Sequence, residues 1–267
     1  MLNALKRSFS EILCALSKQE AGLRVLALQN PLKKNALSSL LIDQMQESIT
    51  DISKDPDSRT VILHSTVPNV FCAGADLKER AQMTPEEVKV FVRKLQQTFN
   101  MLEDLDIPTI ACIDGFALGG GLEMALACDI RVGGLSAKVG LVETSIAVIP
   151  GAGGTYRLPR VVGLSRAKEM VFTAGIYEAK RALEFGIFSQ VDEKPFDKAV
   201  EIARSIGKNG PVAVRLAKKA LDLGFNKERS TSMSIEALCY AQIVNTEDRL
   251  EALQAFKEKR KPQFKGK

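Results

Sequence analysis

The sequence predicts an α/β protein. Short apolar runs of strand type alternate with amphipathic runs of helix type through about the first 190 of its 267 residues. Such alternation is typical of folds in which helices cover a mostly parallel sheet. After about Ser189 the strand pattern stops and only helical runs follow. We therefore predict an α/β core over residues 1–190 and a C-terminal helical region over residues 191–267.

The N-terminal elements follow from apolar runs, a turn residue and one helix cap. Residues 12–16 and 23–28 read as two strands joined by a turn that contains Gly22. Ser38 is a suitable N-cap for a helix running towards Ser53, because a serine oxygen accepts a hydrogen bond from a free amide of the first turn. Apolar residues recur in this helix at helical spacing, at Leu41, Ile42, Met45 and Ile49.

The middle of the chain repeats an order of strand and then helix. Residues 60–64 read as a buried strand and residues 85–105 as a long helix. Residues 108–113 form another strand, which runs directly into a glycine-rich turn. A short helix over residues 120–127 then leads into a strand over residues 129–132. The C-terminal helices are expected at residues 196–208, 211–223, 231–244 and 248–259.

The composition is that of an ordinary soluble globular protein, with 45% apolar and 26% charged residues. No apolar run approaches the roughly 20 residues that a membrane-spanning helix needs, so we do not expect an integral membrane protein. The formal net charge of +5 is modest. It is compatible with an anionic ligand but does not by itself indicate nucleic-acid binding.

The cysteine and histidine content argues against a metal site and against a cysteine or serine nucleophile. The chain has one histidine, His64, which ends an apolar strand and is expected to be structural. Without a Cys-x-x-Cys pair or a Cys/His cluster there is no pattern for structural zinc, and no Ser–His or Cys–His pair is indicated. The cysteines are odd in number and scattered, which favours free thiols; they are Cys14, Cys72, Cys112, Cys128 and Cys239.

Two glutamates each lie beside a glycine-rich run. The first ends Gly115-Phe-Ala-Leu-Gly-Gly-Gly-Leu-Glu123, and the second ends Gly140-Leu-Val-Glu143. Glycine lets a ligand approach bare backbone N–H groups, and a helix N-terminus carries unpaired donors with a partial positive charge. The alternative is a purely structural role, in which the glycines only permit tight packing and the glutamates only complement the charge of helix ends. The pattern favours an oxyanion site flanked by acid–base groups.

Five motifs in the same order resemble the crotonase (enoyl-CoA hydratase/isomerase) superfamily over residues 23–265. The nearest resemblance is to its AU-binding enoyl-CoA hydratase group, which includes methylglutaconyl-CoA hydratase. The resemblance implies a spiral of ββα units and a C-terminal helical region that forms homotrimers or homohexamers. The motifs are Asn35-Ala-Leu37, Phe71-Cys-Ala-Gly-Ala-Asp-Leu77, Gly119-Gly-Gly-Leu-Glu123, Gly140-Leu-Val-Glu143 and Pro150-Gly-Ala-Gly-Gly-Thr155.

The resemblance also implies roles for the motif residues. The N–H groups of Ala75 and Gly120 would form an oxyanion hole for the thioester oxygen. Glu123 would orient and activate water, and Glu143 would be the principal acid/base that protonates the α-carbon. The two carboxyls would share one water and titrate as a coupled pair.

The resemblance places the coenzyme A part of the substrate against two segments and the C-terminal helix. Lys33 and Lys34 would meet phosphate, or would only form a solvated basic turn. No further cofactor is expected, because the glycines of residues 151–154 lack the spacing of a dinucleotide-binding loop. The expected contacts are Lys33, Lys34, Asn35, Ala36, Leu37, Ala73, Asp76, Leu77 and Gly119, with Phe256 and Lys259 from the C-terminal helix.

We expect hydration of a short 2-enoyl-CoA, because the chain has both glutamates that the resemblance to the hydratases implies. Enoyl-CoA isomerisation, AU-rich RNA binding with residual hydratase activity, and a catalytically inactive scaffold subunit are the alternatives. RNA binding is expected to be weak or absent, because few lysines follow Lys34 and acidic Asp43 and Glu47 are present. The acyl group stays open between methylglutaconyl and a generic chain such as crotonyl. The far carboxylate of a methylglutaconyl group would need a cationic partner, for which Arg80 and Arg157 are candidates.

The compartment is suggested by the resemblance, which favours the mitochondrial matrix over the cytoplasm. Residues 1–8 contain two basic residues, and no acidic residue precedes Glu11. This is typical of the end of a mitochondrial presequence, and a ragged start explains it equally well.

Overall fold

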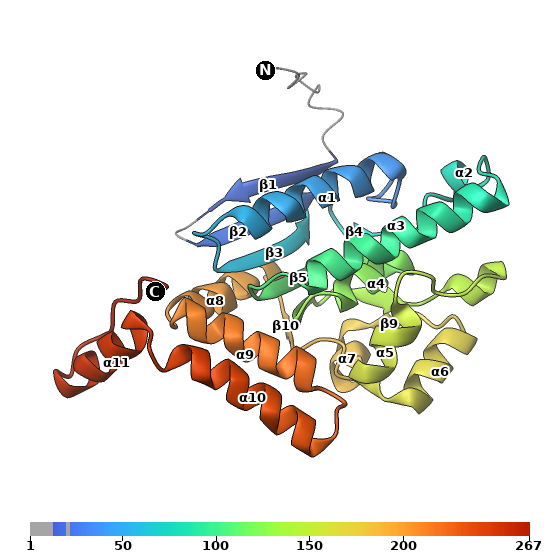
Figure 1. Cartoon of the computed structure of the whole chain (residues 1–267). Helices are drawn as coiled ribbons and strands as arrows, with labels where there is room; N and C mark the ends of the chain where they lie inside the picture. Colours follow the sequence, from blue (N-terminus) through green and yellow to red (C-terminus); the bar gives the residue numbers. More distant parts are fainter. Residues whose placement is uncertain (1–12, 20–21) are drawn as a thin grey trace.

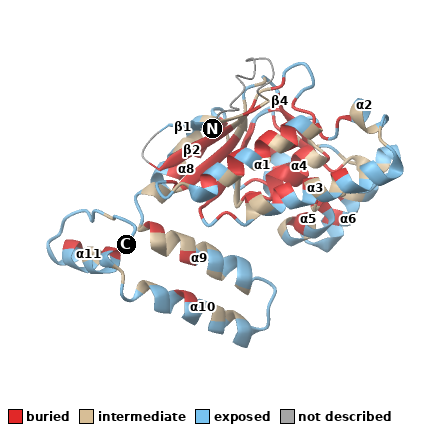
Figure 2. Cartoon of the chain, turned by 45° about the horizontal axis from the view of Figure 1, so that its top comes forward, coloured by how far each residue is buried: buried red, intermediate tan, exposed pale blue. Residues whose placement is uncertain are grey.

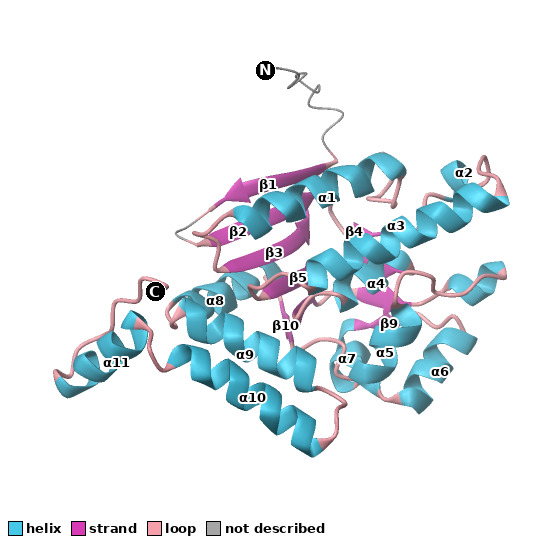
Figure 3. Ribbon diagram, in the orientation of Figure 1, coloured by secondary structure: helices cyan, strands magenta, loops and turns pink. Residues whose placement is uncertain are grey.

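Two β-sheets form the centre of the molecule (Figures 1 and 3). The computed structural model describes residues 13–19 and 22–267, so the predicted basic N-terminal segment and part of the predicted first turn lie outside the described residues. The six-stranded sheet has the order β1-β2-β3-β5-β7-β10 and the four-stranded sheet the order β4-β6-β8-β9. The strands are β1 Cys14–Lys18, β2 Leu23–Leu28, β3 Thr60–Ser65, β4 Val70–Cys72, β5 Thr109–Ile113, β6 Phe116–Leu118, β7 Ile130–Gly134, β8 Lys138–Gly140, β9 Tyr177–Glu178 and β10 Gln190–Asp192.

Helices follow the strand pairs and surround the sheets (Figure 1). Most of them lie within a few residues of the stretches predicted from periodicity. In the described part of the chain they are α1 Ser39–Lys54, α2 Leu77–Arg80, α3 Pro85–Glu103, α4 Gly120–Leu126, the 3-10 turn η2 Glu143–Ile146, α5 Gly154–Val162, α6 Leu164–Phe172, α7 Ala179–Glu184, α8 Pro195–Gly207, α9 Pro211–Gly224, α10 Arg229–Ile243 and α11 Glu247–Lys257.

Three successive strand pairs build the spiral. β3 and β4, β5 and β6, and β7 and β8 each give their first strand to the six-stranded sheet and their second to the four-stranded sheet. The first strands of the three pairs, β3, β5 and β7, are neighbours and run parallel in the larger sheet. The second strands, β4, β6 and β8, are neighbours and run parallel in the smaller sheet. A helix or pair of helices follows each strand pair. The predicted α/β fold of ββα units is therefore confirmed.

Apolar strands at the centre of the larger sheet are buried on both faces. All five residues of β5 are buried, as are the first four of β3, and this explains why their sequences are apolar runs with no polar alternation. On one face, α8 packs Ala199 and Ala203 against Val25, Ile62 and Ile110. The alanines let the helix approach the sheet closely, which adds apolar burial at the centre of the fold.

The caps of α1 and α3 fix where these helices begin. The predicted N-cap Ser38 accepts a hydrogen bond from the Leu41 amide at 3.3 Å. In α3, Thr84 and Glu87 form a capping box that satisfies two free amides of the first turn. The two helices pack against each other, and the N-terminal half of α3 extends towards α2 (Figure 1).

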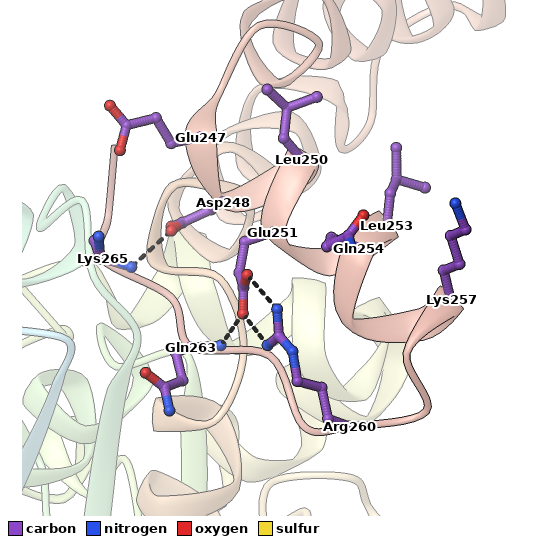
Figure 4. A pocket seen from close by; sticks show the side chains of 10 residues that line it. All are labelled: Glu247, Asp248, Leu250, Glu251, Leu253, Gln254, Lys257, Arg260, Gln263 and Lys265. Atoms are coloured by element: carbon purple, nitrogen blue, oxygen red, sulfur yellow. Dashed lines mark hydrogen bonds and ion pairs between the residues drawn. The ribbon is translucent and has the colours of Figure 1, made fainter.

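Unlike α8, the last three helices, α9, α10 and α11, extend away from the sheets (Figure 2). In α10 only Cys239 is buried, while Leu238 and Tyr240 are 68% and 66% exposed. The chain end folds back on α11, where Asp248 accepts from the Lys265 amide and Glu251 accepts from Arg260 and the Gln263 amide (Figure 4). The division at residue 190 and the role of this region in oligomers stay predictions.

One prediction on strands is wrong. Strands do not stop at Ser189, because β10 pairs in parallel with β7 at the edge of the larger sheet. β10 has only three residues, of which Gln190 is exposed and the other two are half-buried, so it gives no apolar run. No described helix has the length and apolar character needed to cross a membrane.

Candidate active site

The carboxyl ends of β4, β6 and β8 bring the predicted catalytic segments together. These strands are adjacent and parallel in the four-stranded sheet. Each runs directly into one motif: β4 into Ala73–Ala75, β6 into Gly119 and Gly120, and β8 into Leu141–Glu143. Ligands of α/β proteins bind at the carboxyl ends of parallel strands. The sheet thus gathers five of the predicted site residues at one edge, namely Ala73, Ala75, Gly119, Gly120 and Glu143.

Gly119 allows β6 to turn sharply into α4. Its φ of +51° with ψ of −124° is a conformation that glycine adopts far more readily than other residues. A Cβ on this residue would also lie 3.1 Å from the Glu143 Oε1 atom. The Gly119 amide donates to the Gly140 oxygen at 2.8 Å. The glycine turn and the Glu143 carboxylate are therefore in direct contact.

The Ala75 and Gly120 amides, the predicted oxyanion donors, belong to neighbouring segments. A Cβ placed on Gly74 would lie 3.8 Å from the Gly120 nitrogen. Leu37 holds the Ala75 segment through a parallel bridge, in which the Leu37 amide donates to the Gly74 oxygen at 2.8 Å. Across the described residues, neither the Ala75 amide nor the Gly120 amide donates to a main-chain acceptor. Both remain available to a ligand oxygen.

Glu123 is fixed in place by backbone amides. Its Oε1 atom accepts from the Ala152 amide at 2.8 Å and from the Gly154 amide at 2.7 Å. Gly154 is the first residue of α5, so this carboxylate lies at a helix N-terminus. The side chain is buried, and burial raises the pKa of Glu123 although the two amides oppose the rise. Its Oε2 atom lies on the side of Gly120, 3.9 Å from where a Cβ would stand.

Arg157 supports the segment that holds Glu123. It is 4% exposed and donates to the Ala152 oxygen at 3.1 Å. The same guanidinium bonds Glu103 at 2.6 Å and the Asn100 side chain at 2.7 Å. Arg157 is therefore occupied within the protein and is poorly suited to bind a second substrate charge.

Glu143 has no such partners. It opens the short turn η2, and both its carboxylate oxygens are buried without a hydrogen-bond partner among the described residues. Burial raises the pKa of Glu143 to about 7, with a smaller contribution from the charge of Glu123. A carboxyl that titrates near neutral pH is suited both to give and to take a proton.

Several predicted coenzyme A contacts make hydrogen bonds within the protein. Asn35 is fully buried with φ of +54°, and its side chain donates to the Phe71 oxygen at 2.9 Å and accepts from the Asn30 amide at 2.7 Å. Asp76 is buried, caps α2 and pairs with the Lys33 amino group at 2.6 Å. This hydrogen bond lowers the pKa of Asp76 and raises that of Lys33. The two side chains tie the turn before α1 to the Ala75 segment.

The other predicted contacts fall into three groups. Lys34, Ala73 and Leu77 are exposed beside the Ala75 segment, as a docked ligand would require. Ala36 and Leu37 are buried, and the Leu37 Cδ1 atom lies 2.6 Å from where a Cβ on Gly120 would stand. Phe256 is 86% exposed on α11, and Lys259 follows that helix. Figure 1 shows α11 on the side of the molecule opposite to α2, so within one chain these two residues do not join the site.

Sequence analysis missed the amides that hold Glu123. The glycines of residues 151–154 were considered as a dinucleotide-binding loop and rejected as one, whereas the Ala152 and Gly154 amides bind the Glu123 carboxylate directly. A glycine run that opens a helix was the available signal. Within residues 13–19 and 22–267, no group of three or more metal-ligating side chains is found.

Comparison with known proteins agrees with this geometry. The profile of the enoyl-CoA hydratase/isomerase family matches residues 18–267. The chain belongs to this family. It is 49% identical over 257 residues to human mitochondrial methylglutaconyl-CoA hydratase, covering 94% of this chain and 76% of that protein. It is 46% identical over 253 residues to the probable enoyl-CoA hydratase 2, mitochondrial, of Arabidopsis thaliana, covering 94% and 84%.

Solved structures show the same fold. The crystal structure of an enoyl-CoA hydratase from Bacillus anthracis superposes with a TM-score of 0.93 at 44% identity, covering 96% of this chain and 100% of that one. The predicted family and the predicted enzyme class are confirmed by these matches.

Proposed function

We propose that the protein adds water across the 2,3 double bond of a short-chain 2-enoyl-CoA thioester. The observation that carries the proposal is the pair of unlike carboxylates beside one glycine turn. Glu123 is held by two amides, and Glu143 is unpaired with its pKa raised to about 7. Hydration needs one group to activate water and another to deliver a proton. An isomerase, which only moves a proton, needs no second carboxylate.

The thioester oxygen would accept from the Ala75 and Gly120 amides. As water adds, negative charge develops on this oxygen, and two fixed donors stabilise it more in the transition state than in the ground state. The positions of both donors are fixed by neighbours, through the Leu37–Ala75 bridge and the start of α4. The proposed steps need no cofactor other than the coenzyme A of the substrate.

The carboxylates would divide the proton transfers. Glu123, through its Oε2 atom, orients a water molecule and takes one of its protons as the water oxygen bonds to C3. Protonated Glu143 gives its proton to C2, so that one water is added in all. The pair then redistributes its proton, as closely coupled carboxyls do. The raised pKa of Glu143 keeps a useful protonated fraction at neutral pH.

Binding of the nucleotide and assembly complete the proposal. Lys34 is exposed near the Ala75 segment, and Lys33 is half exposed although paired with Asp76. Phe256 and Lys259 would reach the nucleotide only from another copy of the chain in a trimer or hexamer. We propose a mitochondrial location, supported by the human and Arabidopsis relatives, both of which are named as mitochondrial proteins. Methylglutaconyl-CoA, named for the human relative, is one substrate to test.

Loss of enone absorbance with crotonyl-CoA and 3-methylglutaconyl-CoA tests the reaction. Glu143→Gln should lower kcat by a factor on the order of 10²–10⁴, because an amide cannot deliver the proton. Glu193→Gln, the same change at an exposed glutamate before α8, is the matched control and should leave kcat unchanged. Near-normal turnover in Glu143→Gln would contradict the assignment.

A further inference from the structure

One face of α3 carries polar side chains that contact the chain at the start of α5. Gln96, Asn100 and Glu103 follow one another at intervals of four and three residues, a spacing that places side chains on the same side of a helix. Gln96 donates to the Gly151 oxygen at 2.7 Å. The Arg157 guanidinium donates to the Asn100 side-chain oxygen at 2.7 Å and to the Glu103 carboxylate at 2.6 Å. α3 therefore holds the start of α5 at three points.

The peptide bond between Gly151 and Ala152 is bonded on both sides. Its oxygen accepts from Gln96, and its N–H group donates to the Glu123 Oε1 atom at 2.8 Å. The next main-chain oxygen, that of Ala152, accepts from the Arg157 Nη1 atom at 3.1 Å. A hydrogen bond to the oxygen of a peptide polarises its N–H group and strengthens the bond that this group donates. These contacts therefore both fix and strengthen the amide that holds Glu123.

Arg157 fills the space that a side chain on Gly153 would need. Gly153 has a φ of +110°, and a Cβ on it would lie 2.0 Å from the Arg157 Nη1 atom. On the following residue, a Cβ on Gly154 would lie 2.9 Å from the Glu123 Oε1 atom. The chain thus contacts the guanidinium at one glycine and the carboxylate at the next, with no side chain to separate the two charges.

Arg157 is buried although burial of a guanidinium is costly. Its side chain is 4% exposed, and that of its partner Glu103 is 40% exposed. An ion pair taken out of water often adds little stability compared with apolar residues of the same size. Stability is therefore a poor explanation for this pair, and a role in the site is a better one.

The positive charge of Arg157 acts on Glu123. The charged groups that face Glu123 are Arg157 from α5 and Glu143 from η2. Burial raises the pKa of Glu123, and the backbone amides and the charge of Arg157 oppose this rise. Glu103 is half-exposed, so solvent screens its charge and it cancels the field of the buried guanidinium only in part. The charge of Arg157 thus favours the ionised form of the Glu123 carboxyl.

We propose that Arg157 is a positioning residue of the reaction, which holds the Ala152 amide against Glu123 and supplies the charge that keeps this carboxylate ready to take a proton from water. Asn100 and Glu103 hold Arg157 in turn, and Gln96 acts on the same amide from the other side. This inference rests on the proposed function, since it names what prepares the base of that reaction.

Paired variants test whether Arg157 acts through Glu123. With crotonyl-CoA or 3-methylglutaconyl-CoA, whichever wild type hydrates faster, Arg157→Met should lower kcat by about 10–100-fold and change KM by less than about 3-fold. In Glu123→Gln the same change should lower kcat by less than about 3-fold, because the group through which Arg157 acts is already absent. An equal loss in both backgrounds would show a merely structural role and overturn the proposal. Arg160→Met, the same change at an exposed position of α5, is the control and should leave both values unchanged.

Glu103→Gln keeps the proposal testable if Arg157→Met does not fold. Glu103 is half-exposed, and glutamine still offers one oxygen to the guanidinium. Glu103→Gln should lower kcat by about 3–10-fold alone and by less than about 2-fold in Glu123→Gln. No loss in the single variant, or the same loss in both backgrounds, would contradict the role of the α3 side chains.

Titration of the Glu123 carboxyl tests the charge without any turnover. Carbon-13 NMR of carboxyl-labelled glutamate, with Glu123→Gln to identify the signal, gives the midpoint. Loss of a nearby positive charge disfavours a carboxylate, so the midpoint should move to higher pH in Arg157→Met and by less in Arg157→Lys, which keeps a charge. An unchanged midpoint in Arg157→Met would overturn the role of the charge. A wild type that hydrates neither thioester, while Arg157→Met still shows the shift, would overturn the proposed function alone.

Discussion

The surroundings of Glu123 and Glu143 differ in the way that their proposed roles require. Glu123 lies in a rigid setting, with two amides on one oxygen and Arg157 behind the segment that supplies them. Glu143 lies on a short turn with both oxygens unpaired, beside exposed Ile146, Val148 and Ile149. Hydrogen bonds fix a carboxylate in position, whereas burial without them moves its pKa towards neutrality. One glutamate is therefore suited to hold water and the other to exchange a proton.

Among changes at and around Glu123, removing its carboxylate should have the largest effect. Glu123→Gln should lower kcat by a factor on the order of 10²–10³, because water loses its activating base. The pH at which the remaining acid titrates should also fall, since the charge of Glu123 raises the pKa of Glu143. A pH profile of kcat measures both effects. An unchanged kcat would show that Glu143 acts alone.

Displacing Glu123 without removing it should have a smaller effect. A Cβ on Gly154 would lie 2.9 Å from the Glu123 Oε1 atom and 2.9 Å from the Leu141 Cδ1 atom. Gly154→Ala should therefore lower kcat by about 10–100-fold, since small misplacements of a catalytic group are costly. Gly207→Ala at the end of α8, where a Cβ meets nothing within 4 Å, is the control. Equal kinetics in the two variants would mean that the position of Glu123 is not critical.

The smallest effect concerns stability. The folded-state pKa of Glu143 is about 7, above the ordinary value of about 4.3 in an unfolded chain. The contribution of Glu143 to the free energy of unfolding is therefore complete below about pH 4.3 and is lost as pH rises through 7. Glu143→Gln should thus raise the free energy of unfolding at pH 8 by roughly 1–3 kcal/mol, discounted for partial solvent screening. Denaturant unfolding at pH 4 and pH 8 measures the change. A variant less stable than wild type at pH 8 would show that the carboxylate has a partner.

The sequence predicted the long elements well and the short ones poorly. The bounds of β2 and the cap of α1 agree with the structure, because an apolar run and a capping serine are strong local signals. β4, β6, β8 and β10 have three residues each and were not predicted as strands. Three residues give no periodicity, and these strands exist because neighbouring strands pair with them.

The candidate site shows the same limit. Motif order identified Glu123 and Glu143, but no motif shows that one is bonded and the other unpaired. That difference depends on the Ala152 and Gly154 amides, which approach Glu123 from 29 and 31 residues further along the chain. The sequence named Arg80 only as a candidate cation, and no motif shows that its Nη1 atom is buried without a hydrogen-bond partner among the described residues.

Direct titration of the Glu143 carboxyl is the most incisive test of the account. Carbon-13 NMR of glutamate labelled at the carboxyl carbon, with Glu143→Gln to assign the signal, gives its pKa in the free enzyme. We expect a titration midpoint at about pH 7 in wild type and a lower midpoint in Glu123→Gln. A midpoint at the ordinary value of about 4.3 in wild type would contradict the claim that an unpaired, buried Glu143 is the acid of the reaction.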